Sequence, residues 1–223
     1  MADKFDFIDK ALNRRKSQHR LRLLKAVEPI SPVEVAMDGR RMVNFCSNDY
    51  LGLSKHSLLR ERAAQFAAAY GSGATASRLI AGNIACFDRV EKKLAALKQC
   101  EAALILNSGY QANATVIPAL SGPGALILSD RLNHNSIIAG TRLSRADVKV
   151  FEHNDMEHLR HLLEKAAGQG YSRVLIVTES LFSMDGDAAD LPSLVEISKT
   201  SGAILMVDEA HATGLYGKSG MGL

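Results

Sequence analysis

The sequence predicts an α/β fold in which a mostly parallel sheet is covered by helices on both faces. From residue 102 onward, short apolar runs alternate with segments whose apolar residues recur at helical spacing. The runs are continuously apolar, which is typical of parallel strands buried on both faces. The expected strands are 102–106, 125–128, 148–151, 173–178 and 203–207, and the helices between them are 110–120, 135–143, 155–167 and 191–201.

The first hundred residues predict an arm followed by further helices and loops. Residues 5–26 have a helical pattern that Pro29 and Pro32 would end. Residues 33–46 predict a hairpin whose turn is Asp38-Gly39. We therefore expect two domains, an arm over 1–50 and part of a larger α/β domain over 51–223. Within the latter we expect an irregular loop to residue 53, helices over 57–69 and 84–98, and a glycine- and hydroxyl-rich loop over 71–83.

Composition and charge argue against several classes of protein. The hydrophobic share of 47% and net charge of +3 are ordinary for a globular protein. The densest basic stretch, 14–22, is interpreted as a solvated helix face, so no nucleic-acid partner is expected. No apolar stretch approaches the roughly 20 residues of a membrane span. Cys46, Cys86 and Cys100 share no metal-binding spacing, and their odd number favours reduced thiols in a cytoplasmic protein.

Polar residues follow the predicted strands at the point where each strand ends. Ligands of parallel α/β sheets bind at this carboxyl edge. Gly109 and Tyr110 begin a predicted helix, where unpaired backbone N–H groups favour a phosphate group. His134 opens the next helix on the same edge. The other polar residues in these positions are Asn107, Ser108, Ser129, Asp130, Glu179, Asp208, Glu209 and His211.

The letters DEAH at 208–211 allow three interpretations. A nucleotide-driven helicase would use them together with the phosphate-loop-like pattern at 212–219. Such a loop must open a helix, however, and here glycines follow at once. A metal site at Asp208 and His211 would lack evident third and fourth ligands, so no metal is expected.

The third interpretation is a site for pyridoxal 5′-phosphate (PLP). This cofactor needs a carboxylate against its ring nitrogen, and Asp208 at a strand end can supply one. The helix start described above suits its phosphate. His134 can stack on the ring, while His211 and Ser183 can reach its phenolic oxygen. A sheet with polar strand ends and no ligand remains the plain alternative.

Six segments, in the same order and spacing, resemble the α-oxoamine synthase family of fold-type-I PLP enzymes. They are FCSNDYLGLS, GSGATASRLIAGN, LNSGYQAN, SDRLNHNSI, TESLFSMDGD and VDEAHATGLYG. The similarity runs from about residue 10 to the last residue. Members of the family join an amino acid to an acyl thioester with loss of carbon dioxide. VDEAHATG, RLNHNSII and HNDMEHL are most similar to the members that join L-alanine to a pimeloyl thioester in biotin synthesis.

The resemblance implies a role for each residue of the cofactor site. Asp208 would pair with the pyridine nitrogen and His211 with the phenolic oxygen, with Ser183 beside them. His134 would stack on the ring and guide the amino acid. Asp208, His211 and His134 would therefore be the catalytic residues.

The resemblance also implies phosphate and substrate contacts. Gly109 and Tyr110 would lie at the cofactor, with backbone amides toward its phosphate. Asn48 would hold the substrate carboxylate, and Arg22 matches an N-terminal substrate-binding arginine. Family members are homodimers with active sites at the subunit interface, so the loop 71–83 would serve the neighbouring subunit. The acyl carrier would be coenzyme A or acyl carrier protein.

One family feature does not appear in this sequence. The Schiff-base lysine lies some tens of residues after the Asp-x-x-His box, whereas this chain stops at Leu223. We therefore expect the arm and most of the large domain of a longer enzyme, without its C-terminal part and inactive alone. The alternatives are a synthase of the glycine C-acetyltransferase or serine palmitoyltransferase type, or a non-catalytic partner subunit that lacks the lysine.

Overall fold

The computed structural model describes residues 4–223, which divide into two compact units at Gly73. The first unit runs to Gly73 and the second from Ala74 to Leu223, and each is described by itself. The domain division expected after residue 50 stays a prediction. No helix among residues 4–223 is both long and apolar enough to cross a lipid bilayer.

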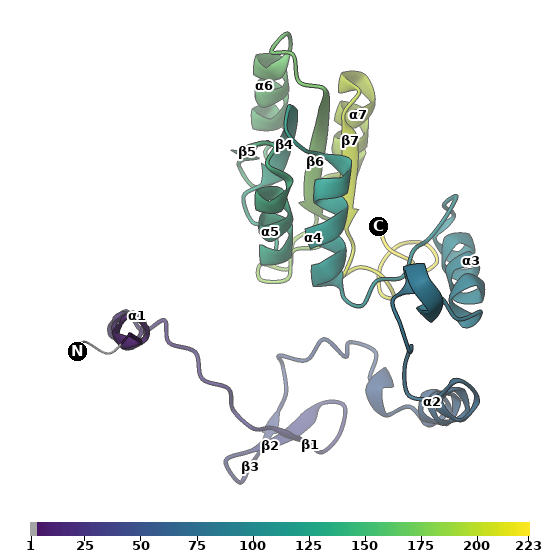
Figure 1. Ribbon diagram of the computed structural model, residues 1–223. Coiled ribbons are helices and arrows are strands. Elements are labelled where there is room, and N and C mark those ends of the chain that lie inside the picture. The colour runs from purple at the N-terminus through teal and green to yellow at the C-terminus, as the bar shows by residue number, and fades with distance from the viewer. Residues whose placement is uncertain (1–3) are drawn as a thin grey trace. The chain divides into compact units, whose positions relative to one another are not determined.

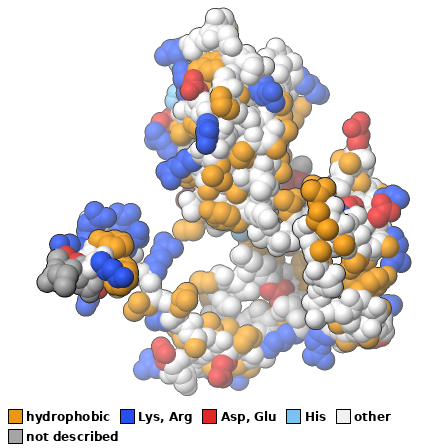
Figure 2. All heavy atoms as spheres, viewed as in Figure 1, with side chains coloured by type: hydrophobic (Ala, Val, Ile, Leu, Met, Phe, Trp, Pro, Cys, Tyr) orange, Lys and Arg blue, Asp and Glu red, His pale blue; other side chains and the backbone are white. Residues whose placement is uncertain are grey.

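The first helix, α1 (Asp6–Ser17), ends earlier than the sequence pattern over 5–26 predicts. Its last turn holds Arg14, Arg15 and Lys16, and Figure 2 shows blue Lys and Arg side chains gathered around it. Basic groups suit a helix C-terminus, and the backbone leaves the helical conformation at His19, whose φ is 53°. The prediction of a helix to residue 26 was therefore wrong.

The predicted hairpin is confirmed. Strands β1 (Glu28–Pro29), β2 (Glu34–Met37) and β3 (Arg40–Val43) form a three-stranded antiparallel sheet. The Asp38-Gly39 turn has φ values of 51° and 71°, as a two-residue turn matched to the twist of its strands requires. The first unit continues with η1 (Leu53–Lys55) and α2 (Ser57–Tyr70).

The second unit contains the parallel sheet that the apolar runs predict. Its strand order is β5-β4-β6-β7, and all three neighbouring pairs are parallel. The strands are β4 (Ala125–Asp130), β5 (Asp147–Phe151), β6 (Arg173–Glu179) and β7 (Ile204–Asp208). The helices are α3 (Cys86–Lys98), α4 (Gly109–Leu120), α5 (Asn135–Ser144), α6 (Met156–Ala166) and α7 (Leu191–Ser201), with the short π-helix η2 (Arg78–Gly82) at the start.

The two faces of this sheet are covered by different helices (Figure 1). Leu126, Leu128 and Ile176 pack with α6 and α7. Ile127, Leu175 and Val177 pack with α4 and α5 on the opposite face. Because successive strand residues point to opposite faces, this alternation also decides where the polar residues at the strand ends lie.

The segment 102–106 is not a strand, although its apolar run predicts one. The sheet of the second unit has β5 and β7 at its edges, and 102–106 pairs with neither. The backbone groups of Ile105, within this segment, are bonded by side chains instead. The Ile105 N–H donates to Glu91 Oε1 (2.7 Å), and the Ile105 carbonyl accepts from Arg78 Nη1 (3.0 Å). An apolar run forms a β-strand only when another strand lies beside it to complete its backbone hydrogen bonds.

Candidate functional site at the carboxyl edge of the sheet

Three carboxyl groups lie at the ends of parallel strands: Asp130 on β4, Glu179 on β6 and Asp208 on β7. Glu179 and Asp208 are register neighbours, and the Ser180 N–H donates to the Asp208 carbonyl at 2.9 Å. By the alternation of the strands, Glu179 and Asp208 belong to the face covered by α4 and α5, and Asp130 to the other. The contacts agree with this: Asp208 bonds Asn113 of α4 and Glu179 bonds the His134 N–H at the start of α5. Asp130 instead bonds His153 and Asn154, which follow β5.

Asp208 is half-buried, and both of its carboxylate oxygens are hydrogen-bonded. Oδ2 accepts from Asn113 Nδ2 at 2.7 Å, and Oδ1 accepts from the Ala210 N–H at 2.9 Å. Asn113 is on α4, one turn after Gly109, so the first part of α4 lies beside the end of β7. Two donors on one carboxylate fix its orientation.

His134 caps the start of α5. Its Nδ1 accepts from the Ser136 N–H at 3.3 Å and lies 2.7 Å from Ser136 Oγ. The His134 backbone N–H donates to Glu179 Oε1 at 2.5 Å. Asn113 Nδ2 also donates to Ser136 Oγ, at 2.9 Å. His134 and Asp208 therefore belong to one continuous hydrogen-bond network.

His134 and Ser183 line the same cavity of about 240 Å³. Ser183 lies in the loop between β6 and α7, with its side chain exposed. Glu179 lies at the same cavity, and burial raises its pKa, with the nearby charge of Asp208 acting in the same direction and the His134 N–H opposing it. The other lining residues are Leu132, Asn133, Asn135, Phe182, Met184 and Asp185.

The start of α4 has the arrangement of an anion site. The Ser108 side chain caps the helix by accepting from the Gln111 N–H at 3.1 Å. Gly109 and Tyr110 are the first two residues of the helix, whose N–H groups have no partner within the helix. The Asn113 contact with Asp208 places this helix start near the strand edge.

The structure does not gather every residue that the sequence singled out. His211 is half-buried in the turns after β7 and lies outside the lining of the 240 Å³ cavity. Arg22 and Asn48 are exposed residues of the first unit, and Asn48 Oδ1 accepts from Tyr50 Oη at 3.3 Å. Asp208, Gly109 and Tyr110 also lie outside the lining of the 240 Å³ cavity. The roles expected for all of these residues, and for His134 and Ser183, stay predictions.

Sequence reasoning missed two residues of this network, Asn113 and Ser136. Both are buried, with exposed fractions of 5% and 1%. Asn113 is a polar residue on a mostly apolar helix, one turn from Gly109, which is a signal that a buried partner is needed. Ser136 stands two residues after the helix-capping His134. Glu179 was among the strand-end residues, but no role was expected for it.

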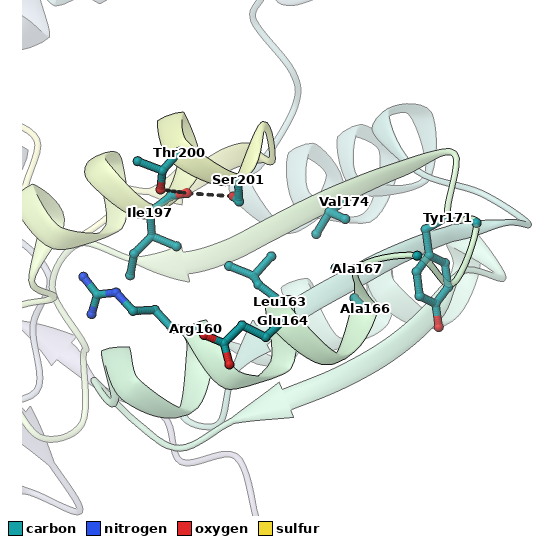
Figure 3. Close-up of a pocket in the computed structure, with 12 residues that line it drawn as sticks. Arg160, Leu163, Glu164, Ala166, Ala167, Tyr171, Val174, Ile197, Thr200 and Ser201 are labelled. Carbon is teal, nitrogen blue, oxygen red and sulfur yellow. Dashed lines mark hydrogen bonds between the residues drawn. The ribbon is translucent and has the colours of Figure 1, made fainter.

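A larger hollow of about 640 Å³ lies between α6 and α7 (Figure 3). Leu163, Val174 and Ile197 contribute apolar side chains to it. The hydroxyls of Thr200 and Ser201 donate to the Ile197 carbonyl. Arg160 and Glu164 add charged side chains to this lining, but none of the residues singled out from the sequence lies in it. Among residues 4–223, no cluster of three His, Cys, Asp or Glu side chains could hold a metal ion.

Comparison with known families decides between the interpretations of this edge. The model of the aminotransferase class I and II family matches residues 40–222. The chain belongs to this family. Its members are PLP-dependent enzymes of fold type I, so the sheet and its helices are those of a PLP-enzyme large domain.

The curated relatives include 8-amino-7-oxononanoate synthases. A protein of Desulfosudis oleivorans that carries this name provisionally is 59% identical over 220 residues, which are 99% of this chain and 57% of the relative. The 8-amino-7-oxononanoate synthase of Geobacter sulfurreducens is 47% identical over 211 residues, 95% of this chain and 54% of the relative. The chain thus spans about half the length of the curated relatives it matches.

Solved structures of the same fold include serine palmitoyltransferases. The Sphingomonas wittichii enzyme matches with a TM-score of 0.89 and 31% identity, over 99% of this chain and 56% of that chain. A serine palmitoyltransferase variant solved with PLP has a TM-score of 0.88 and 28% identity, over 99% and 56%. The 8-amino-7-oxononanoate synthase from Francisella tularensis has a TM-score of 0.65 and 29% identity, over 80% and 48%.

The residues at this edge fit PLP. An oriented carboxylate at Asp208, a capped helix start at Gly109 and an imidazole at His134 match the pyridine nitrogen, the phosphate and the ring of the cofactor. Within residues 4–223, Asp208 is bonded by two donors that carry no charge, so its negative charge is available to a cationic ring.

Proposed function

We propose that this chain carries the PLP-binding part of an acyltransferase that condenses L-alanine with a pimeloyl thioester. Carbon dioxide would be lost and 8-amino-7-oxononanoate formed. The proposal is supported by the relatives of that name at 59% and 47% identity. The observation that carries the cofactor assignment is the Asp208 carboxylate, held at a strand end by Asn113 and the Ala210 N–H.

Asp208 would hold the ring of the cofactor. When PLP is bound, its protonated ring supplies an electron sink for the amino acid. The Asp208 carboxylate would keep the proton on the ring nitrogen, because an anion beside a cation stabilises the charged form of both. His211, three residues later, would pair with the phenolic oxygen.

His134 and Ser183 would bound the cofactor from the cavity that they share. The capping contacts of His134 with Ser136 fix its ring, and a fixed imidazole can present a flat face to a ligand. Ser183 would contribute a hydroxyl from the loop after β6. Gly109 and Tyr110 would hold the phosphate through their backbone N–H groups.

The substrate contacts belong to the same proposal. Asn48 would bind the carboxylate of L-alanine, and Arg22 would bind substrate from the N-terminal arm. The whole protein would act as a cytoplasmic homodimer, with coenzyme A or acyl carrier protein as the acyl carrier. The cytoplasm is supported by three cysteines that are all free thiols in the structure.

The reaction can be tested on the protein purified from its source organism and loaded with PLP. The protein is incubated with pimeloyl coenzyme A and, in a second series, with pimeloyl-acyl carrier protein, each with L-alanine, glycine or L-serine in parallel. The products are identified by mass spectrometry. We expect 8-amino-7-oxononanoate from L-alanine and at least tenfold less product from glycine and serine. Preferred use of glycine or serine would overturn the substrate assignment, and PLP-loaded protein without product from any of them would contradict the activity.

A further inference from the structure

The hydrogen bonds that Asn113 makes to Asp208 and to Ser136 have a single possible direction. The Asn113 amide nitrogen only donates, so both of its contacts, to Asp208 Oδ2 and to Ser136 Oγ, are donations. The Ser136 hydroxyl accepts one of them, which leaves its own proton free to be donated to His134 Nδ1, 2.7 Å away. The Ser136 backbone N–H points to the same nitrogen.

These contacts determine which nitrogen of the neutral His134 ring carries the proton. A nitrogen that accepts from a hydroxyl and a backbone N–H has its lone pair occupied and holds no proton of its own. The proton of the neutral imidazole must then lie on Nε2. The edge that carries Nε2 is the one that Ser136 does not occupy.

We propose that Asn113 and Ser136 are positioning residues that couple Asp208 to His134. Together they hold the Asp208 carboxylate in one orientation and keep His134 as its Nε2–H tautomer before any ligand arrives. The significance of this for catalysis rests on the proposed function, whereas the tautomer itself follows from the protein's own contacts. Neither residue needs to touch the cofactor to act in this way.

The packing of α4 on α5 supports this role. A methyl group added at Gly140 of α5 would lie 2.5 Å from the Asn113 carbonyl and 3.0 Å from Ile117 Cδ1. Glycine at this position therefore lets the two helices approach closely. That close approach places the Asn113 amide between Ser136 and Asp208. Because both residues of the link are buried, water competes little for its hydrogen bonds.

The tautomer can be measured by long-range ¹H–¹⁵N NMR on the ¹⁵N-labelled chain without cofactor. The His134 resonances are assigned by their loss in His134→Gln. We expect the wild-type signals to show a protonated Nε2 and an unprotonated Nδ1, with the other tautomer at least tenfold less populated. A protonated Nδ1 in the wild type would overturn the proposal, even if no variant folds.

Variants of the link separate positioning from mere folding. Ser136→Ala and Asn113→Ala should each lower the tautomer ratio at least fivefold, while Ser136→Thr, which keeps the hydroxyl, should restore it. Ser144→Ala is the matched control, because Ser144 is a buried serine of the same helix whose hydroxyl donates to the Thr141 carbonyl. If Ser136→Ala changes the ratio no more than Ser144→Ala, the proposal is wrong. The correct tautomer in a chain that does not bind the cofactor would leave this inference intact and refute the proposed function.

Discussion

A 2.7 Å hydrogen bond joins His153 Nε2 to Asp187 Oδ2 and ties the end of β5 to the loop that carries Ser183. The other ring nitrogen, Nδ1, lies 2.9 Å from Asp130 Oδ1 on β4. The Phe182 and His153 rings are nearly perpendicular, with a centroid distance of 4.4 Å. His153 therefore fixes the loop that carries Ser183 through its contacts with Asp187 and Phe182.

The first prediction concerns the pH dependence of this contact. Burial alone would lower the pKa of His153, but its hydrogen bonds to Asp130 and Asp187 outweigh burial and raise it. A raised folded-state pKa stabilises the fold below the unfolded value of about 6.5 and loses that effect as the pH rises through the folded value. His153 also lowers the pKa of Asp187. The stabilisation that the ionised Asp187 contributes is therefore lost as the pH falls below about 4.

His153→Gln should therefore lower the free energy of unfolding by about 1–3 kcal/mol near pH 5.5 and by less at pH 8.5. Urea denaturation of both proteins at the two pH values measures the difference. The control is His161→Gln, an exposed histidine on α6. An equal loss at both pH values would mean that the charge of His153 does not stabilise the fold.

The second prediction concerns Glu179, whose pKa is raised chiefly by burial. The carboxylate form is disfavoured in the fold, so stability should fall as the pH rises above the unfolded value of about 4.3. Glu179→Gln removes this charge but keeps an acceptor for the His134 N–H. We expect the variant to be more stable than wild type at pH 8 and equal to it at pH 4. Glu157→Gln, at an exposed position of α6, should have the same stability as wild type at both pH values.

Gly140 should not tolerate a side chain. Gly140→Ala would force a methyl group to within 2.5 Å of the Asn113 carbonyl, so α4 and α5 must separate. Overpacking of this kind typically costs about 1–3 kcal/mol of stability, measured as a fall in the denaturation midpoint. Gly122→Ala, where nothing lies within 4 Å of the new methyl group, is the matched control. Equal midpoints for the two variants would show that the helices are not in close contact.

Arg78 should limit local unfolding of the segment 102–106, which precedes α4. Its guanidinium bonds Glu91 through two nitrogens, at 2.6 and 3.0 Å, and Glu91 in turn accepts from the Ile105 N–H. A lysine cannot reproduce this two-nitrogen contact. Arg78→Lys should therefore speed hydrogen exchange of the Ile105 amide several-fold, whereas Arg60→Lys on α2 should not. An unchanged Ile105 rate would show that this contact does not hold the segment.

The sheet could be predicted because its signal is local. The apolar runs that became β4, β5, β6 and β7 are each bounded by polar residues, and the observed strands begin and end within two residues of the expected positions. The period of two also places Glu179 and Asp208 on one face. The prediction of a strand over 102–106 was wrong because a strand also depends on a neighbouring strand, which the apolar run itself does not specify.

The site could be predicted only in part for a similar reason. Asp208, His134 and Gly109 stand at element ends, which periodicity can locate. The roles of Asn113 and Ser136 depend on which helix packs beside which strand end, and no single segment contains that information. Their contacts become evident only when α4, α5 and β7 are together.

The most direct test of the account is calorimetric titration of the chain with 4′-deoxypyridoxine 5′-phosphate. This ligand keeps the ring and phosphate of the cofactor but has no aldehyde, so it cannot react with surface lysines. We expect one site per chain and at least tenfold weaker binding, or about 1.4 kcal/mol, for Asp208→Asn. Asp88→Asn, at an exposed position on α3, should bind as wild type does. No binding to the wild type, or equal binding to Asp208→Asn, would contradict a cofactor site at this edge.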